Sequence, residues 1–337
     1  MNAVELWKRP DVPATEPFPD AILAAISAEH AAAKACEGRA GEEALLGPIS
    51  TVKEQAHAPT EGYRPAWTTL VHLPPLIPFR PRVRRPRAMS FPHASSLLLL
   101  GMPVMKTLSN RELPSCLYPH STVGRVEYGH GTSFDRPLGW GTGTLVGPNL
   151  LLTAGHLMPW DHPPEGWWMR FVPGYVSGLE PYGRSYVQSV RGYRPDGDEP
   201  HGLDYVICRL YTPLGERVGW MGSQSFGDED EYYDRRWTSI GYPSVYMNGQ
   251  QPAMDVNIDI EDIDGDNNDS LELEVDYSTA FAGGWSGGPL WDWVGGDPRV
   301  AGVKSGFEVD GYDPARGVFA GGGPMVALVK FGWENWQ

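Results

Sequence analysis

From about residue 120 onward the sequence is divided into short β-type segments, and this division constrains the fold more than any other feature. Each segment is rich in β-branched or alternating apolar residues and is closed by Gly, Pro, Asn or Asp. Examples are STVGRVEYG, GTGTLVGPNLLLTAGH, LDYVICRLY, SLELEVDY and RVAGVKSGF. The 41 Gly and 32 Pro residues are spread through the chain without a repeat, as in proteins with many strands and turns. The pattern predicts an all-β barrel or sandwich.

The part of the chain before these segments has a different amino-acid composition. Residues 20–46 are rich in Ala, Glu and Leu at helical spacing and predict one or two helices. Residues 58–92 are rich in Pro and include the basic run RPRVRRPRAM, which predicts a linker or an extended arm. Near the C-terminus, PMVALVKFG predicts a short helix that starts at Pro and stops at Gly. We therefore expect a partly helical, Pro-rich N-terminal extension and two β units, over residues 1–118, 119–226 and 227–337.

Charge and cysteine content exclude several functional classes. The formal net charge of −15 argues against a nucleic-acid-binding role, since phosphate contacts need clustered Lys and Arg. Cys36, Cys116 and Cys208 form no CxxC pair, so we expect neither a zinc site nor a disulfide framework. The N-terminus lacks the apolar run of a signal peptide, and the apolar stretch 95–105 is too short to span a bilayer. These features predict no membrane association and favour an intracellular location.

Ser286 is the strongest candidate for a nucleophile. It lies in AGGWSGGPLW, where glycines on both sides allow a tight backbone turn. Such a turn can direct the N–H groups of Gly284 and Ser286 into one concavity, as an oxyanion requires. Taken alone, the motif is equally typical of a Gly-rich turn in a β protein.

Gly284, Ser286 and Gly288 also match the GxSxG nucleophile elbow of α/β-hydrolases. That fold places its catalytic histidine after the serine. None of the nine histidines follows Ser286, and the flanking sequence is not a parallel βαβ pattern. The order of residues along the chain therefore excludes an esterase or lipase of the α/β-hydrolase fold.

His156 and Asp204 are the candidates for the base and its orienting carboxylate. His156 ends the apolar run TLVGPNLLLTAGH, and small residues before it would let the imidazole project from a strand end. A lone histidine is more often structural, so this assignment depends on its context. Asp204 opens the strand-like LDYVICRL, where a buried carboxylate needs a donor such as a histidine N–H.

The segments GTGTLVGPNLLLTAGH, GLDYVICRL and GGWSGGPL occur in the order and approximate spacing of the chymotrypsin-fold (trypsin-like) serine proteases. The resemblance covers about residues 119–334, and the first segment is most similar to the glutamyl-endopeptidase-like branch. It implies two antiparallel β-barrels and hydrolysis through an acyl-enzyme, without a metal or organic cofactor. It also implies that His156 is the general base, that Asp204 orients it, that Ser286 attacks, and that the Gly284 and Ser286 N–H groups form the oxyanion hole.

The chain departs from this family at several positions. Trp285 replaces the aspartate that pairs with a newly cut N-terminus in the animal digestive members, so activation by that ion pair is not expected. Glutamate-cutting relatives have a histidine at the position of Lys304 and a small hydroxyl residue at that of Phe281, so their specificity is not carried over. The resemblance maps the substrate pocket onto Ala280, Phe281, Val303, Lys304, Ser305 and Gly306.

Lys304 leaves two alternatives open. Its ammonium near the pocket would attract an acidic side chain of the substrate. Alternatively, the lysine points to solvent or pairs with Glu308 or Asp310.

The acidic run DIEDIDGDNNDS resembles a calcium loop, but Asn267 occupies the position of the required glycine. We therefore expect a solvated acidic hairpin loop there.

Two roles remain open for the N-terminal extension. It is either a propeptide with RVRRPR as a cleavage site, which we favour, or a permanent accessory region that docks on the protease domain. For the whole chain, the leading hypothesis is a serine endopeptidase that acts on protein or peptide substrates. The alternative is a latent or non-catalytic binding or scaffold protein with the same fold.

Overall fold

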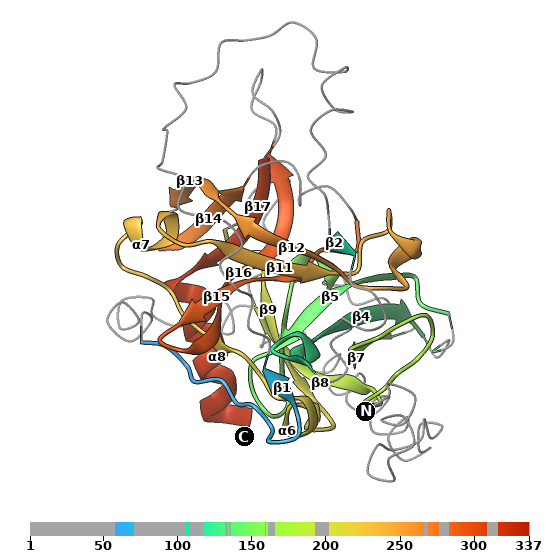
Figure 1. The fold of residues 1–337 in the computed structure, drawn as a ribbon. Helices are drawn as coiled ribbons and strands as arrows, with labels where there is room; N and C mark the ends of the chain where they lie inside the picture. Colours follow the sequence, from blue (N-terminus) through green and yellow to red (C-terminus); the bar gives the residue numbers. More distant parts are fainter. Residues whose placement is uncertain are drawn as a thin grey trace, which may run out of the picture.

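Strands dominate the described part of the computed structural model, and the helices there are short apart from one at the C-terminal end (Figure 1). The prediction of an all-β fold is confirmed. The helices expected over residues 20–46 lie outside the described residues, as does the basic arm that follows residue 70. The structure describes residues 58–70, 106–107, 117–131, 134, 136–158, 160, 166–192, 202–265, 269–275, 283–308 and 316–336.

The first β unit is a closed barrel with the strand order β4-β5-β6-β9-β8-β7. Its strands are β4 (Val123–His130), β5 (Gly139–Leu145), β6 (Leu150–Thr153), β7 (Trp167–Pro173), β8 (Ser185–Gly192) and β9 (Val206–Leu210). β4 pairs antiparallel with both β5 and β7, so Val126 lies opposite Gly141 on one side and Phe171 on the other. Closure leaves the barrel without an unpaired edge strand.

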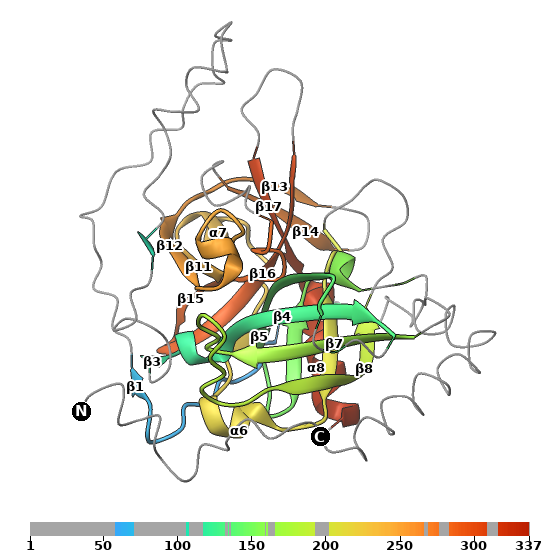
Figure 2. The same cartoon turned by 90° about the vertical axis from the view of Figure 1, so that its right-hand side faces the viewer.

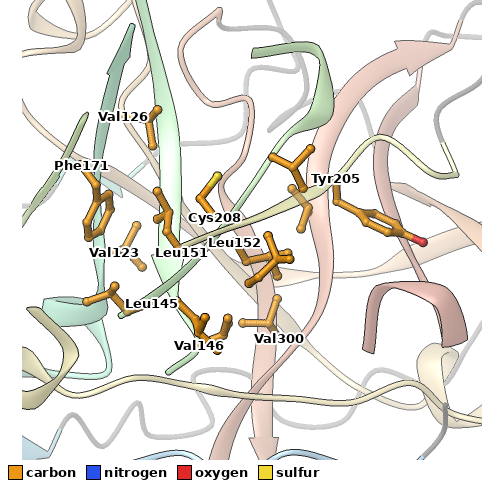
Figure 3. Packing of buried hydrophobic residues seen from close by; sticks show 14 of the residues in the cluster. Val123, Val126, Leu145, Val146, Leu151, Leu152, Phe171, Tyr205, Cys208 and Val300 are labelled. Atoms are coloured by element: carbon orange, nitrogen blue, oxygen red, sulfur yellow. The ribbon is translucent and has the colours of Figure 1, made fainter. Parts of the chain in front are cut away.

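Apolar side chains from these strands fill the barrel interior (Figure 3). Val126, Leu152 and Phe171 are almost completely buried there. Val300, from the second β unit, belongs to the same cluster, so the two units share part of their core. Cys208 is a free and fully buried cysteine, and burial raises the pKa of its thiol.

The second β unit is a curled sheet with the order β13-β14-β17-β16-β15-β11-β12-β2. Its strands are β2 (Lys106–Thr107), β11 (Trp237–Gly241), β12 (Ala253–Ile258), β13 (Ile260–Gly265), β14 (Ser270–Val275), β15 (Pro289–Val294), β16 (Asp297–Glu308) and β17 (Arg316–Gly322). β12 and β13 lie near opposite ends of this order, yet only Asp259 separates them in the chain. The sheet must therefore curl strongly, and it forms a half-barrel beside the closed barrel of the first unit.

The chain between the two β units forms α6 (Leu214–Val218), the short strand β10 (Gly222–Ser223) and α7 (Asp230–Tyr233). β10 pairs with β16 of the second unit. The acidic stretch around residue 230 thus contains a short helix and leads into β11. We call residues 219–223 the linker.

The predicted C-terminal helix is confirmed as α8 (Gly323–Trp336), but it continues past the glycine expected to stop it. Gly332 lies against the first barrel, where a Cβ would come 3.0 Å from Leu150 and 3.3 Å from Ile207. The missing side chain thus serves close packing rather than helix termination. No helix in the described residues combines the length and apolarity needed to cross a membrane.

β13 and β14 pair antiparallel and frame the acidic run in which a hairpin was expected. Residues 266–268 at its tip lie outside the described residues. Arg316 on β17 bonds to Asp262 and to Glu274 of these strands, so part of the acidic charge is neutralised within the sheet.

Residues 58–70, which we call the strap, run along the linker near α6 (blue in Figures 1 and 2). Tyr63 forms an antiparallel bridge with Trp220. The strap ends in β1 (Thr69–Leu70), which pairs parallel with β3 (Leu117–Tyr118) just before the first barrel. Part of the expected N-terminal extension is therefore joined to the β units by regular backbone pairing.

Candidate active site

The register of β6 and β9 brings His156 and Asp204 together. These strands are antiparallel, and Thr153 at the end of β6 lies opposite Val206 at the start of β9. His156 lies in a short 3-10 turn just after β6, and Asp204 lies two residues before the start of β9. Both side chains therefore emerge at the same end of the barrel.

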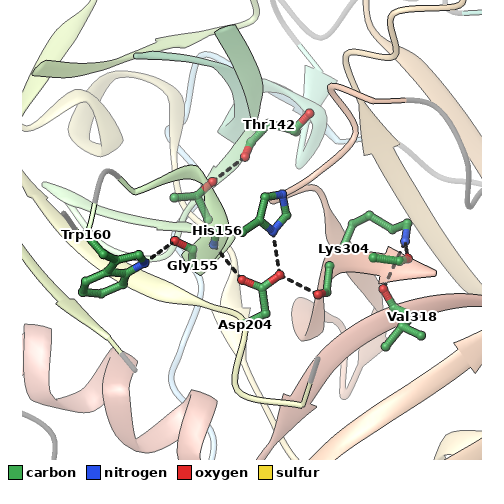
Figure 4. A network of polar contacts seen from close by, with 10 residues as sticks. Thr142, Gly155, His156, Trp160, Asp204, Lys304 and Val318 are labelled. Atoms are coloured by element: carbon green, nitrogen blue, oxygen red, sulfur yellow. Dashed lines mark hydrogen bonds and ion pairs between the residues drawn. The ribbon is translucent and has the colours of Figure 1, made fainter. Parts of the chain in front are cut away.

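Two hydrogen bonds join these residues (Figure 4). Nδ1 of His156 lies 2.7 Å from Oδ2 of Asp204, and the backbone N–H of His156 donates to Oδ1 at 2.7 Å. The side chain of Asp204 is 6% exposed, whereas that of His156 is 41% exposed. The arrangement orients an accessible imidazole with a buried carboxylate, as a histidine base requires.

A third donor reaches the same carboxylate. The Ser305 hydroxyl on β16 donates a 2.5 Å hydrogen bond to Oδ2 of Asp204. Burial alone would raise the pKa of Asp204, but the hydrogen bonds and charge of His156 and the Ser305 hydroxyl hold this pKa below its usual value. Asp204 is thus kept as an anion, which favours a proton on Nδ1 of His156 and leaves Nε2 free to accept one.

The loop that carries Ser286 depends on two glycines in the left-handed region. Gly284 has a φ of 93° and Gly287 a φ of 86°. At Gly287, a Cβ would lie 2.0 Å from the Thr142 carbonyl oxygen and 3.0 Å from the Ala154 nitrogen. Any side chain there would strain the backbone and collide with the first barrel. Because Ala154 is two residues before His156, this close approach brings the Ser286 loop to the His156 end of that barrel.

Trp285 fixes the Ser286 loop to β11. Its side chain is buried, and its Nε1 donates a 2.9 Å hydrogen bond to the Ser239 hydroxyl on β11. The indole packs on Gly241, where a Cβ would lie 2.5 Å from the ring. The residue that departs from the digestive proteases thus fixes the loop to the second sheet.

Thr142 on β5 holds the loop from the first barrel. Its hydroxyl donates a 2.8 Å hydrogen bond to the carbonyl of Gly284 and accepts one from Tyr242 N–H at 3.0 Å. Its backbone N–H donates to the carbonyl of Ser286 at 2.7 Å. Because Thr142 binds the carbonyls of both Gly284 and Ser286, the peptide groups that follow these two residues are held in one orientation.

Trp140, also on β5, packs against the same loop. Its Nε1 donates a 2.9 Å hydrogen bond to the carbonyl of Tyr242, and a Cβ on Gly284 would lie 2.5 Å from that nitrogen. The guanidinium of Arg125 lies 4.8 Å from the centre of the indole ring. These contacts make a rigid wall from residues of both units.

The N–H groups proposed for the oxyanion hole are free of backbone partners in the described part of the chain, since no backbone hydrogen bond uses the N–H of Gly284 or Ser286. The structure does not join the whole candidate triad, however. Among the described residues, no hydrogen bond links the Ser286 hydroxyl to His156.

The predicted pocket residues divide into three groups. Ala280 and Phe281 lie outside the described residues. Val303 and Lys304 face the Ser286 loop through the backbone, since Val303 pairs with Pro289 and the Lys304 carbonyl accepts the Gly287 N–H at 2.8 Å. Ser305 directs its hydroxyl to Asp204, and the Gly306 carbonyl accepts a hydrogen bond from Lys304.

Lys304 does not point to solvent. It is 2% exposed, and its Nζ donates to the carbonyl oxygens of Gly306 and, at 3.2 Å, Val318. The ammonium also lies 5.4 Å from the ring centre of Phe319. Burial lowers the pKa of Lys304 to about 7, against the opposing effect of the Asp204 charge.

Sequence reasoning did not identify the supporting roles of Thr142, Trp140 and Ser305. Thr142 and Gly284 are 142 residues apart in the sequence, so no local motif contains both of them. The GTGT run on β5 contains Thr142, but nothing in that run marks the residue as a partner of Gly284. Among the described residues, no group of three or more His, Cys, Asp and Glu side chains is placed to hold a metal ion.

Comparison with known families agrees with this geometry. Residues 141–303 match the family model described as the trypsin-like peptidase domain, and this stretch contains His156, Asp204 and Ser286. This stretch is therefore similar to a trypsin-like peptidase domain. The resemblance to chymotrypsin-fold serine proteases expected from the sequence is therefore confirmed.

Solved proteases are also similar to this chain. A Glu endopeptidase in complex with MPD is 16% identical with a TM-score of 0.51, covering 68% of this chain and 96% of its own. The protease Anisep from Arthrobacter nicotinovorans is 19% identical with a TM-score of 0.43, covering 60% and 90%. The thermostable serine protease AL20 from an extremophilic microorganism is 17% identical with a TM-score of 0.45, covering 64% and 98%. No curated protein matches the chain.

Proposed function

We propose that this protein is a serine endopeptidase in which His156, Asp204 and Ser286 form the catalytic triad. The observation that carries the proposal is the 2.7 Å contact between Nδ1 of His156 and the buried carboxylate of Asp204, at the barrel end that the Ser286 loop reaches. In this mechanism His156 takes the proton of the Ser286 hydroxyl as it attacks a peptide carbonyl, and then donates it to the leaving amine. A water molecule then attacks the acyl-enzyme, and His156 takes its proton and returns it to Oγ of Ser286 as the acid product leaves.

The Gly284 and Ser286 N–H groups stabilise the oxyanion in this proposal. Support comes from Thr142, which holds the carbonyls of the same two residues from the opposite side. Donors fixed before the reaction need no reorganisation as charge develops on the substrate oxygen. We further propose that residues 119–226 supply the base and its carboxylate, and that residues 227–337 supply the nucleophile and the oxyanion hole.

A fluorophosphonate probe, which reacts with activated serines, tests the triad. The wild-type protein should be labelled at Ser286, and Ser286→Ala should not be labelled. Ser189→Ala, a partly exposed serine on β8, is the matched control and should be labelled as the wild type is. Labelling that survives in Ser286→Ala, or a wild type that hydrolyses peptides without modification of Ser286, would contradict the proposal.

We also propose that the peptidase prefers an acidic side chain at the cleaved residue. Support comes from the Lys304 ammonium, which lies in a buried site and is only one residue from Ser305, the partner of Asp204. Since the pKa of Lys304 is about 7, the preference should be strongest below that pH, where the ammonium is charged. The measurement is digestion of a peptide library at pH 6 and pH 8, and equal cleavage after Glu, Leu and Lys at both values would refute the preference.

A latent protease-fold protein is the second candidate, favoured by the missing hydrogen bond between the Ser286 hydroxyl and His156. Such bonds are often long before substrate binds, so this feature alone does not exclude activity. The same probe separates the two candidates. A protein that is folded but never labelled, whether intact or with its N-terminal extension removed, favours the latent role.

A further inference from the structure

The strap, residues 58–70, pairs with the linker, residues 219–223, as an additional strand. Thr60 N–H donates to the Ser223 carbonyl at 2.9 Å, while Tyr63 and Trp220 exchange backbone hydrogen bonds of 2.9 and 3.0 Å. The Thr60 hydroxyl accepts a 2.8 Å hydrogen bond from the Ser223 N–H. The strap therefore binds mainly through its backbone, in the manner of an extended peptide that adds to a sheet edge.

Glycines make the groove that holds this strand. A Cβ on Gly222 would lie 2.3 Å from the Thr60 carbonyl oxygen, and one on Gly219 would lie 2.5 Å from that of Tyr63. On the strap side, a Cβ on Gly62 would lie 2.8 Å from the Tyr118 hydroxyl and 3.2 Å from the Gly222 nitrogen. Both surfaces thus lack side chains at the points of closest approach, so they fit one another in a single register.

Side chains outside the backbone pairing add specific contacts. The carboxylate of Glu61 lies 3.2 Å from the guanidinium of Arg299 on β16, whose side chain is only 11% exposed. The ring of Tyr63 packs on that of Trp220 with 4.6 Å between centroids, and Trp220 Nε1 donates to the Glu61 carbonyl. The strap therefore contacts both the linker and the second sheet.

We propose that the strap is a permanent strand of the peptidase domain, and that it stays bound when the chain is cut between the strap and the first barrel. The groove at residues 219–223 is then a binding site for one extended segment of this chain, residues 60–63. This inference does not depend on the proposed catalytic activity. A propeptide role, if the extension has one, would be confined to residues before the strap.

The experiment cuts the chain at a defined point. The recognition sequence of a specific protease replaces residues 80–87 in the full-length Ser286→Ala protein, which cannot digest itself if Ser286 is the nucleophile. After cleavage, gel filtration without denaturant should show the strap fragment eluting with the rest of the protein. The two pieces should separate only in urea. Release of the fragment without denaturant, from a body that keeps its melting temperature, would overturn the proposal.

Strap variants test the register without altering the β units. Gly62→Val introduces the colliding Cβ and should release most of the cut fragment under the conditions in which the parent protein retains it. Ala66→Val adds a side chain of similar size at an exposed strap position and should retain the fragment. Glu61→Lys, which opposes Arg299 with a like charge, should release more fragment as salt is lowered. Retention by all three variants as in the parent would refute the proposed register.

Discussion

The hydroxyl of Thr142, on the first barrel, donates a 2.8 Å hydrogen bond to the carbonyl of Gly284, in the loop that carries the candidate nucleophile. The same hydroxyl accepts the N–H of Tyr242. One side chain thus joins the two β units at the point where the proposed oxyanion hole is formed.

The variant Thr142→Val should lower kcat for peptide hydrolysis about tenfold or more, with a smaller change in KM. Valine keeps the shape of threonine but leaves the Gly284 carbonyl and the Tyr242 N–H without their partner, so the loop loses its fixed orientation. The stability should fall by about 1–3 kcal/mol for the same reason.

Thr144→Val is the matched control for this change. Thr144 lies on the same strand and is fully buried, but its hydroxyl has no hydrogen-bond partner among the described residues. Its replacement should leave kcat unchanged. Equal losses of kcat in the two variants would show that β5 packing, rather than the Thr142 hydroxyl, positions the loop.

Ser305→Ala should raise the pKa of Asp204, because it removes one of the hydrogen bonds that stabilise the carboxylate. A lowered folded-state pKa contributes stability above the unfolded value of about 4, and this stability is lost as pH falls through the folded value. In the variant the loss should still begin near the unfolded value, but it should end at a higher pH than in the wild type and be smaller in total. Urea unfolding between pH 2.5 and pH 6 measures the difference.

The control for that experiment is Ser270→Ala. Ser270 is buried on β14, and its hydroxyl has no hydrogen-bond partner in the part of the chain that the structure describes. Its pH dependence of stability should match that of the wild type. An identical acid transition for wild type and Ser305→Ala would mean that the Ser305 hydroxyl does not stabilise the Asp204 anion.

Lys304→Met should change the pH dependence of stability on the alkaline side. The pKa of Lys304 is lowered to about 7 in the folded protein, so between this value and 10.5 the unfolded chain binds a proton that the folded chain does not. The free energy of unfolding of the wild type therefore rises with pH across this window, by up to about 1.4 kcal/mol per pH unit from this group.

In Lys304→Met this slope should be lost, and the protein should be more stable than the wild type at pH 7. Lys330→Met, a substitution on the surface of α8, should keep most of the slope. Denaturant unfolding of each protein in the Ser286→Ala background between pH 7 and pH 10 provides the measurement. A wild-type slope retained in Lys304→Met would show that another group titrates there.

The contact between Trp285 and Ser239 can be measured by a double-mutant cycle. Trp285→Phe and Ser239→Ala should each destabilise the protein, because each leaves a buried polar group without its partner. The double variant should lose less than the sum of the two, with a coupling energy of about 1 kcal/mol. Strict additivity of the single losses would mean that the hydrogen bond contributes nothing to holding the loop.

Much of the fold was predictable because strands and turns leave local signals in the sequence. Segments such as TLVGPNLLLTAGH carry β-forming residues and end at Gly, Pro or Asn, so the all-β class follows from them directly. The C-terminal helix was also predicted, but its end was not. From the sequence alone, Gly332 predicts the end of the helix, whereas in the structure it allows the helix to pack closely against Leu150.

The sequence by itself determined which residues are candidates for the chemistry, since histidine order excluded the rival serine-hydrolase fold around Ser286. Only the tertiary structure decided how they are supported. The pairing of β6 with β9 brings Asp204 to His156, and β16 brings Ser305 to the same carboxylate and buries Lys304. These contacts join residues 48 and 101 positions apart, and they depend on strand register and barrel closure. Local sequence patterns do not encode these, because any one segment is compatible with many partners.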